Sequence, residues 1–129
     1  MQTLDANCVV RWVMRDGPAK TAAMDALVAA RSPLRLPDVA LIEAVYVLES
    51  HYGLARVDVA EAIRLVIGQA VFELDRTLWT DVLDLWTTHP KLSVTDVYLA
   101  KDATRRGDTP LMTFDRKVVT QLGGVSPTA

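Results

Sequence analysis

The chain has 129 residues, of which half are hydrophobic, and a formal net charge of −2 from 14 basic and 16 acidic side chains. This size and composition predict one globular domain, residues 1–129, with a substantial core, and they disfavour a general polyanion-binding face. No apolar run approaches the roughly 18 residues of a membrane span, and no signal segment is evident. With Cys8 as the one cysteine, we expect a cytoplasmic protein without an internal disulfide.

The first half of the chain alternates short strands with helices. Met1–Leu4 is predicted to be a strand, and a helical run through Met14 follows Asp5. After a turn at residues 16–18, Ala19–Arg31 is predicted to be a helix with Ala23, Leu27 and Ala30 on its inner face. Leu34–Leu36 is the second predicted strand, and Pro37 closes it.

Two more helices are predicted before the next strand. Asp38 is the expected N-cap of a long helix that runs to about Tyr52. The following helix is predicted over Val59–Gln69, with Asp58 as its N-cap. Its expected inner residues are Ala62, Leu65 and Val66. Ala70–Leu74 is the third predicted strand.

The second half continues the alternation. A helix opened by Asp75 or Thr77 runs through Trp86, and Ser93–Arg106 is the next predicted helix. Pro110–Phe114 is a predicted buried strand, followed by a helix that ends near Leu122. This pattern indicates an α/β domain with a parallel sheet. A fifth strand has room only in the tail around Val125.

Two of the predicted strands end in an acid that also begins a helix. Asp5 follows the first strand and Asp115 follows the strand over Pro110–Phe114. Ligands of doubly wound α/β sheets bind outside the carboxyl ends of strands, where the strand order reverses. If the two strands are neighbours there, Asp5 and Asp115 share one pocket.

Two further acids stand out. Glu43 has only apolar residues on either side in its helix, and such surroundings are costly for a carboxylate unless it is paired or binds a metal. The alternative is that Glu43 lies on the solvent-exposed stripe. Asp96 follows Ser93 by three residues, which is the spacing of a capping box. Asp5 and Asp115 have the same alternative, because aspartate is a common N-cap.

Four clustered carboxylates repel one another unless a cation is present, and oxygen ligands suit Mg²⁺ or Mn²⁺. If Asp5, Glu43, Asp96 and Asp115 share such a site, 12 acidic and 14 basic residues remain for the rest of the surface. No cysteine or histidine has the spacing of a rival metal site. Cys8 is expected to be a small packing residue rather than a nucleophile.

At these residues the chain resembles the PIN-domain ribonucleases, and most closely the VapC-type toxins of bacterial toxin–antitoxin pairs. The resemblance covers nearly the whole chain. Its matching pieces, in order, are Leu4-Asp5-Ala6-Asn7, Glu43, Thr95–Ala100 and Leu111–Asp115.

The resemblance implies an α/β/α sandwich with a central parallel sheet in the order 3-2-1-4-5, and Mg²⁺- or Mn²⁺-dependent endoribonuclease activity. It places Asp5, Glu43, Asp96 and Asp115 on the family's four acids and makes Asn7 and Thr113 polar supports. Many members carry a further acid at the position of Ser93, which is a poor metal ligand but a good cap. A cognate antitoxin and a homodimer are also implied.

We expect Asp5, Asp96 and Asp115 to be direct metal ligands and Glu43 to act through water. Basic residues near the strand ends, which either contact RNA phosphates or are merely solvated, are Arg11, Arg15, Arg116 and Lys117. Two other interpretations stay open: a non-catalytic PIN-like binding domain, and an acid-pocket phosphatase or receiver domain. The latter is disfavoured because no lysine ends a strand.

Overall fold

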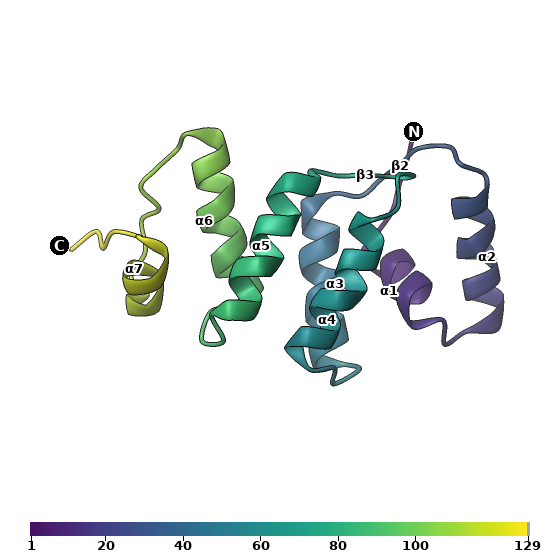
Figure 1. Cartoon of the computed structure of the whole chain (residues 1–129), viewed down its shortest axis with the longest axis horizontal. Coiled ribbons are helices and arrows are strands. Elements are labelled where there is room, and N and C mark those ends of the chain that lie inside the picture. The colour runs from purple at the N-terminus through teal and green to yellow at the C-terminus, as the bar shows by residue number, and fades with distance from the viewer. Residues whose placement is uncertain (129) are drawn as a thin grey trace. The chain divides into compact units, whose positions relative to one another are not determined.

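The computed structural model describes residues 1–128 and divides into two compact units (Figure 1). Unit 1 is Met1–Asp75, and unit 2 runs from Arg76 onward. Unit 1 contains helices and a small parallel sheet, so the expected α/β class is confirmed. In the described part of the chain, no helix has both the length and the apolarity needed to cross a membrane.

The sheet of unit 1 has three short parallel strands in the order β1-β2-β3. Their bounds are Gln2–Thr3, Leu34–Arg35 and Phe72–Glu73. Leu34 lies opposite both Gln2 and Phe72 in the register. Leu34 and Phe72 are buried whereas Arg35 and Glu73 are exposed, which is the alternation that the pleat of a strand imposes. The expected order of the first three strands is therefore present, and the five-strand order stays a prediction.

Four helices complete unit 1. They are α1 (Ala6–Met14), α2 (Pro18–Ala29), α3 (Asp38–Ser50) and α4 (Arg56–Ile67). Helix α1 packs against the other three, and Figure 1 shows it between α2 and the pair α3 and α4. The core of this unit includes Val9, Leu41 and Ile63, all essentially inaccessible, and Trp12 meets Phe72 edge-on with ring centroids 5.3 Å apart.

Two predicted N-caps in unit 1 are wrong. Helix α3 has Pro37 at its N-cap, and Asp38 is its first residue. Helix α4 begins at Arg56 with Ala55 as its N-cap, three residues before the predicted Val59, so Asp58 lies in the first turn. Acids are favourable throughout the first turn because they complement the helix dipole. The acidic residues therefore marked the first turn of each helix but not its N-cap residue.

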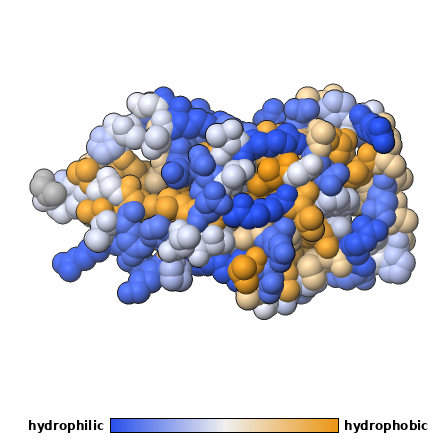
Figure 2. Space-filling view, in the orientation of Figure 1, coloured by the Kyte–Doolittle hydropathy of each residue, from blue (hydrophilic) through white to orange (hydrophobic). Residues whose placement is uncertain are grey.

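The predicted inner face of α2 is not the buried one, and of the three predicted inner residues of α4 only Val66 is fully buried. In α2 the buried residues are Thr21 and Met24, whereas Ala23 is exposed. In α4 the side chain of Leu65 is 62% exposed, although Ile63 and Val66 are fully buried. Apolar residues lie on more than one side of each helix, so periodicity alone did not select the packed face. Figure 2 shows such hydrophobic side chains among hydrophilic ones over the helices of unit 1.

Over the residues that the structure describes, unit 2 has three helices: α5 (Arg76–Thr88), α6 (Val94–Arg106) and α7 (Arg116–Leu122). Helix α5 packs against α6, with Trp79 and Trp86 fully buried and the Trp79 ring stacked on Tyr98 at 5.6 Å. Both tryptophans therefore belong to the core of unit 2. Gly107 ends α6 in the left-handed conformation, which glycine adopts readily after a helix.

The predicted strand over Pro110–Phe114 is not a regular strand. Met112 forms one isolated parallel bridge with Val125, and the flanking N–H groups of Thr113 and Val125 each donate a 2.9 Å hydrogen bond across it. The tail around Val125 is thus extended and paired, as expected of the only remaining candidate strand. A Cβ on Gly124 would lie 2.9 Å from Thr113 Cγ2, so this close pairing requires glycine there.

Candidate metal and RNA site

Asp5 follows β1 and is the N-cap of α1. Its Oδ1 accepts a 3.0 Å hydrogen bond from the backbone N–H of Cys8, and the carboxylate is exposed. A cap uses one of about four lone-pair sites of a carboxylate, so capping leaves acceptor capacity for a cation. The predicted position of Asp5, at a strand end and a helix start, is confirmed.

The Cys8 thiol is half-buried beside Asp5. Burial raises the pKa of this thiol, and the hydrogen bond with the Asp5 carboxylate raises that pKa further. A raised pKa keeps the sulfur protonated at neutral pH, whereas a nucleophile must be a thiolate. The environment of Cys8 therefore supports a packing role.

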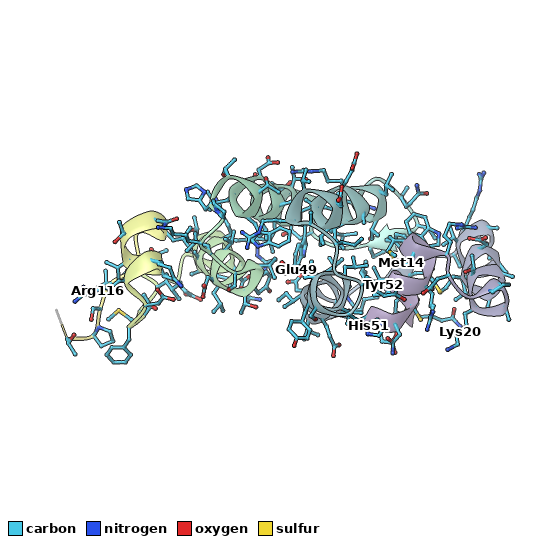
Figure 3. All side chains as sticks on the ribbon, turned by 90° about the horizontal axis from the view of Figure 1, so that it is seen from below. Met14, Lys20, Glu49, His51, Tyr52 and Arg116 are labelled. Atoms are coloured by element: carbon cyan, nitrogen blue, oxygen red, sulfur yellow. The ribbon has the colours of Figure 1, made fainter. Side chains whose placement is uncertain are left out.

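Asp5 also lines a pocket between α1 and α2, with a volume of about 420 Å³. Asn7 and Arg11 line it from α1, and Lys20 and Met24 line it from α2. Three residues of the expected site thus share one open cavity. Lys20 was not anticipated, because only the packing of α2 on α1 brings it beside Asp5. Lys20 belongs to α2 and is labelled in Figure 3.

Glu43 is exposed on α3, which is the alternative of a solvent-exposed stripe that its sequence left open. One turn away on either side lie Val39, which is 70% exposed, and Tyr46, which is 68% exposed. The buried stripe of α3 contains Leu41, Ala44, Val45 and Leu48 instead. Neighbours in sequence point to other sides of a helix, whereas residues three or four apart share a face.

Asp96 is half-buried in the first turn of α6, where Ser93 is the N-cap. Ser93 Oγ accepts a 3.1 Å hydrogen bond from the backbone N–H of Asp96. This is the serine-to-N3 half of the capping box that the spacing predicted. This hydrogen bond involves only the backbone N–H of Asp96, so the Asp96 carboxylate takes no part in it.

Asp115 is the N-cap of α7. Its Oδ1 accepts a 2.8 Å hydrogen bond from the backbone N–H of Lys117, and Oδ2 lies 3.8 Å from the Lys117 ammonium. Thr113 Oγ1 accepts a 3.0 Å hydrogen bond from the backbone N–H of Asp115. The expected polar support by Thr113 is thus visible as a side-chain turn that orients Asp115.

Three of the four basic residues proposed to meet phosphates are paired with carboxylates: Lys117 with Asp115, and two more in unit 1. Arg11 Nη1 donates to Asp16 Oδ1 at 2.7 Å, and Arg15 makes two hydrogen bonds with Asp25, at 3.0 and 2.6 Å. These ion pairs are exposed, so RNA phosphates could replace them at low cost. Arg116 and Lys117 are exposed at the start of α7, and Figure 3 labels Arg116 there.

The four acids divide equally between the units. Asp5 and Glu43 belong to unit 1, and Asp96 and Asp115 belong to unit 2. Among the described residues of either unit, no three His, Cys, Asp or Glu side chains are placed to hold a metal ion. Each unit therefore supplies part of the predicted ligand set, and neither supplies all of it.

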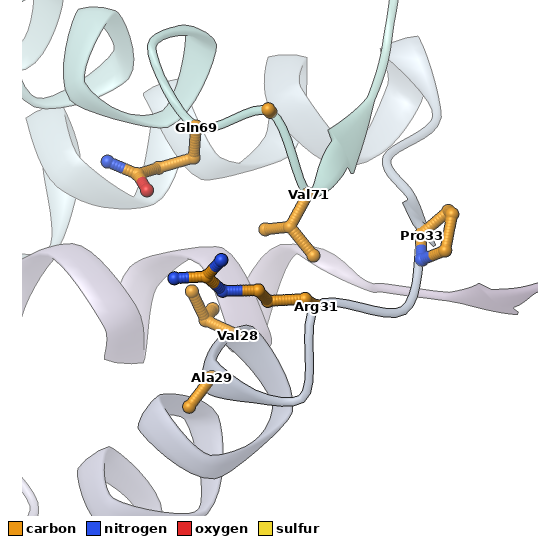
Figure 4. Close-up of a pocket in the computed structure, with 7 residues that line it drawn as sticks. Val28, Ala29, Arg31, Pro33, Gln69 and Val71 are labelled. Atoms are coloured by element: carbon orange, nitrogen blue, oxygen red, sulfur yellow. The ribbon is translucent and has the colours of Figure 1, made fainter.

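A second pocket in unit 1, of about 490 Å³, lies before the N-terminal ends of β2 and β3 (Figure 4). Arg31, Pro33, Gln69 and Val71 are among its lining residues. No acid lines it, and it adjoins the sheet edge opposite to the one where Asp5 follows β1. It is therefore separate from the candidate site.

A parallel sheet flanked by helices, with an acid at a strand's carboxyl end, defines an α/β protein of the kind that binds ligands at that edge. The chain belongs to the PIN-domain family, which matches residues 3–122. Searches of curated proteins and of solved structures found no match. PIN domains are generally nucleases that use divalent metal ions.

Proposed function

We propose that this chain is a Mg²⁺- or Mn²⁺-dependent endoribonuclease of the VapC type, the toxin of a toxin–antitoxin pair. The observation that carries the proposal is the family match over residues 3–122, which contains all four expected acids. Three of those acids stand at helix starts, and Asp5 and Asp115 come directly after extended segments. In the proposed five-strand sheet, Asp5 and Asp115 would follow the carboxyl ends of neighbouring strands.

The residues fit such a metal by the chemistry of their donors. Hard divalent cations take carboxylate oxygens, and all four residues offer them. Asp5, Asp96 and Asp115 would hold the ion, and Glu43 would act through water. Bound Mg²⁺ or Mn²⁺ supplies Lewis-acid stabilisation of the charge that develops on a phosphodiester.

The chain's own residues have separate tasks in this proposal. Thr113 holds the backbone of Asp115, and Ser93 holds that of Asp96, so both carboxylates start from ordered helix ends. Asn7 supports the site from the first turn of α1. Arg11, Arg15, Arg116 and Lys117 would contact phosphates of the RNA.

The proposal includes one PIN domain over residues 1–129, with the sheet order 3-2-1-4-5 in an α/β/α sandwich. The observed order β1-β2-β3 supports its first half, and the Met112–Val125 bridge supports the pairing of its last two strands. A homodimer and an antitoxin that covers the acid pocket, in the cytoplasm, belong to the same proposal.

The test is cleavage of RNA by the purified chain, freed of any partner. We expect Mn²⁺ or Mg²⁺ to support cleavage and EDTA to stop it, and Asp5→Asn to abolish it while the fold is kept, because asparagine is also a good N-cap. Cleavage that survives EDTA, or none across several RNAs with Mn²⁺, would favour the non-catalytic binding domain. Mapping of cleavage sites on total RNA would identify the target.

A further inference from the structure

The pocket between α1 and α2 contains chemistry that the proposed reaction does not use. Asp5 and Asn7 lie at its α1 side, and the α2 side brings a cation, Lys20, together with Ala23 and Leu27. Its volume of about 420 Å³ is within the range of ligand-binding pockets. A site for the metal alone would need neither an apolar wall nor a lysine.

Lys20 is the distinctive feature of this wall. It is exposed, and no hydrogen bond or ion pair is formed by its ammonium within the part of the chain that the structure describes. Arg11, the other cation of the pocket, is already held by Asp16. Lys20 therefore provides positive charge that no carboxylate of unit 1 neutralises.

We infer that this pocket is a nucleotide subsite: it receives one nucleotide of single-stranded RNA beside the bond that is cut, with Lys20 on its phosphate. The inference rests on the proposed ribonuclease function, which puts the scissile phosphate at Asp5. Ala23, Met24 and Leu27 offer an apolar surface to the base, and the Asn7 amide offers a donor and an acceptor to its edge.

The charge favours RNA over a protein segment as the occupant. Lys20, Arg11 and Asp5 are the charged residues that line the pocket, and because Arg11 is paired with Asp16, Lys20 is the cation left to meet a phosphate. Single-stranded RNA binds through phosphate contacts with lysine or arginine together with contacts to the faces of the bases, and a cation beside an apolar wall offers both.

The role of the Lys20 charge is tested by measuring RNA binding under conditions that do not allow cleavage. A fluorescein-labelled single-stranded RNA is titrated with the full chain in EDTA at several salt concentrations. We expect Lys20→Ala to weaken binding several-fold and to reduce the slope of log K against log[salt] by about 0.7, the value for one phosphate contact on a single strand. Lys20→Arg should restore both. Lys91→Ala, which removes an exposed lysine of unit 2, is the matched control and should leave both unchanged.

A second variant tests the cavity itself. Ala23 is exposed on α2 and lines the pocket, so Ala23→Phe should fill it without disturbing the core. We expect RNA binding to fall several-fold. Ala26→Phe, at an exposed position of the same helix outside the pocket lining, should not have this effect.

The outcomes separate the subsite from the nuclease. If Lys20→Ala and Ala23→Phe both leave RNA affinity and salt slope unchanged, the subsite is wrong, even if the chain cleaves RNA with Mn²⁺. If both variants weaken RNA binding but the wild type cleaves no RNA, the pocket binds RNA and the nuclease proposal is wrong. In an active enzyme, Lys20→Ala should raise KM and leave kcat nearly unchanged. The reason is that the contact between Lys20 and the phosphate would stabilise the bound substrate and the transition state equally.

Discussion

The Asp115 carboxylate meets Lys117 twice: Oδ1 accepts the backbone N–H at 2.8 Å, and Oδ2 lies 3.8 Å from the ammonium. Both side chains are partly exposed, so the ion pair contributes little to stability, whereas the cap positions the carboxylate at the start of α7. Asp115 is therefore both the N-cap of α7 and a proposed metal ligand. A substitution that keeps the cap but removes the charge separates the two roles.

Asp115→Asn is expected to keep the cap, because asparagine and aspartate are equivalent N-caps, and to lose the anionic ligand. The melting temperature in EDTA should change by no more than a few degrees, as expected for about 0.3–1 kcal/mol of lost helix-dipole interaction. Mn²⁺-dependent RNA cleavage should fall by at least about 100-fold if the carboxylate stabilises the transition state through the metal. Circular dichroism melts and a gel-based cleavage assay measure the two effects.

Asp108→Asn is the matched control for this experiment. Asp108 is an exposed acid of unit 2 that follows α6 and is not an N-cap of any helix described there. It should retain wild-type cleavage. Equal activity of wild type and Asp115→Asn would remove Asp115 from the ligand set.

Glu43→Gln tests an acid that lies on the exposed face of α3, the alternative that the sequence left open. Because Glu43 is on the outer face of α3, glutamine should leave the fold and the melting temperature unchanged. Cleavage should nevertheless fall strongly if the carboxylate orients water in the site. Glu61→Gln, at an exposed position of α4, is the control for loss of one surface charge. If both variants keep full activity, Glu43 is a surface acid and the site has three carboxylates.

The parts of the site that sequence predicted well are local. An N-cap is a contact within three residues, so Asp5, Ser93 and Asp115 could be assigned from their neighbours in the chain, and the structure confirms all three. The caps of α3 and α4 were misassigned because Asp38 and Asp58 lie one and three residues inside the helix start. Sequence thus located every helix that the structure describes, with errors at the ends.

The parts that sequence missed depend on packing between elements. Lys20 enters the pocket of Asp5 only because α2 packs on α1, and Arg15 meets Asp25, ten residues away, for the same reason. The sequence left open whether Glu43 is buried or exposed, because the residues adjacent to it in sequence lie on other faces of α3. The extended segment around Met112 was correctly located, but its pairing reaches only one bridge.

The Tyr52–Asp16 contact predicts a pH-dependent stability. Tyr52 Oη donates to Asp16 Oδ2 at 2.6 Å. This bond, followed by the interaction with Arg11, lowers the pKa of the Asp16 carboxyl, and the same bond raises the pKa of the Tyr52 hydroxyl. The stabilisation should be present between the unfolded-state pKa values of about 4 and about 10. It is lost as pH falls through the lowered pKa of Asp16 or rises through the raised pKa of Tyr52.

Tyr52→Phe should accordingly lower the free energy of unfolding at pH 5–9. Its difference from wild type should shrink below about pH 4 and above about pH 10. Urea denaturation across this pH series measures the difference. Tyr46→Phe, at an exposed position of α3, should show no such pH dependence. A constant difference for Tyr52→Phe at all pH values would mean that the effect does not come from the bond to Asp16.

Asp96→Asn decides between a cap and a metal ligand, because the two roles predict opposite signs without metal. The Ser93 bond goes to the backbone N–H of Asp96, so asparagine keeps it and loses only the charge. If that charge serves the helix alone, the variant should be destabilised by about 0.3–1 kcal/mol, with or without metal. If Asp96 shares a pocket with like charges, the metal-free variant should be as stable as wild type or more stable.

Thermal melts of wild type and Asp96→Asn, each in EDTA and in Mn²⁺, measure both quantities. We expect the variant to melt at the same temperature or higher in EDTA. Its melting temperature should rise less on addition of Mn²⁺ than that of wild type. The stabilisation by a bound ligand increases with the logarithm of the ligand concentration divided by Kd, and the variant should have a higher Kd for Mn²⁺. A variant that melts lower in EDTA and gains as much from Mn²⁺ would show that Asp96 is only a first-turn acid of α6, and would exclude it from the metal site.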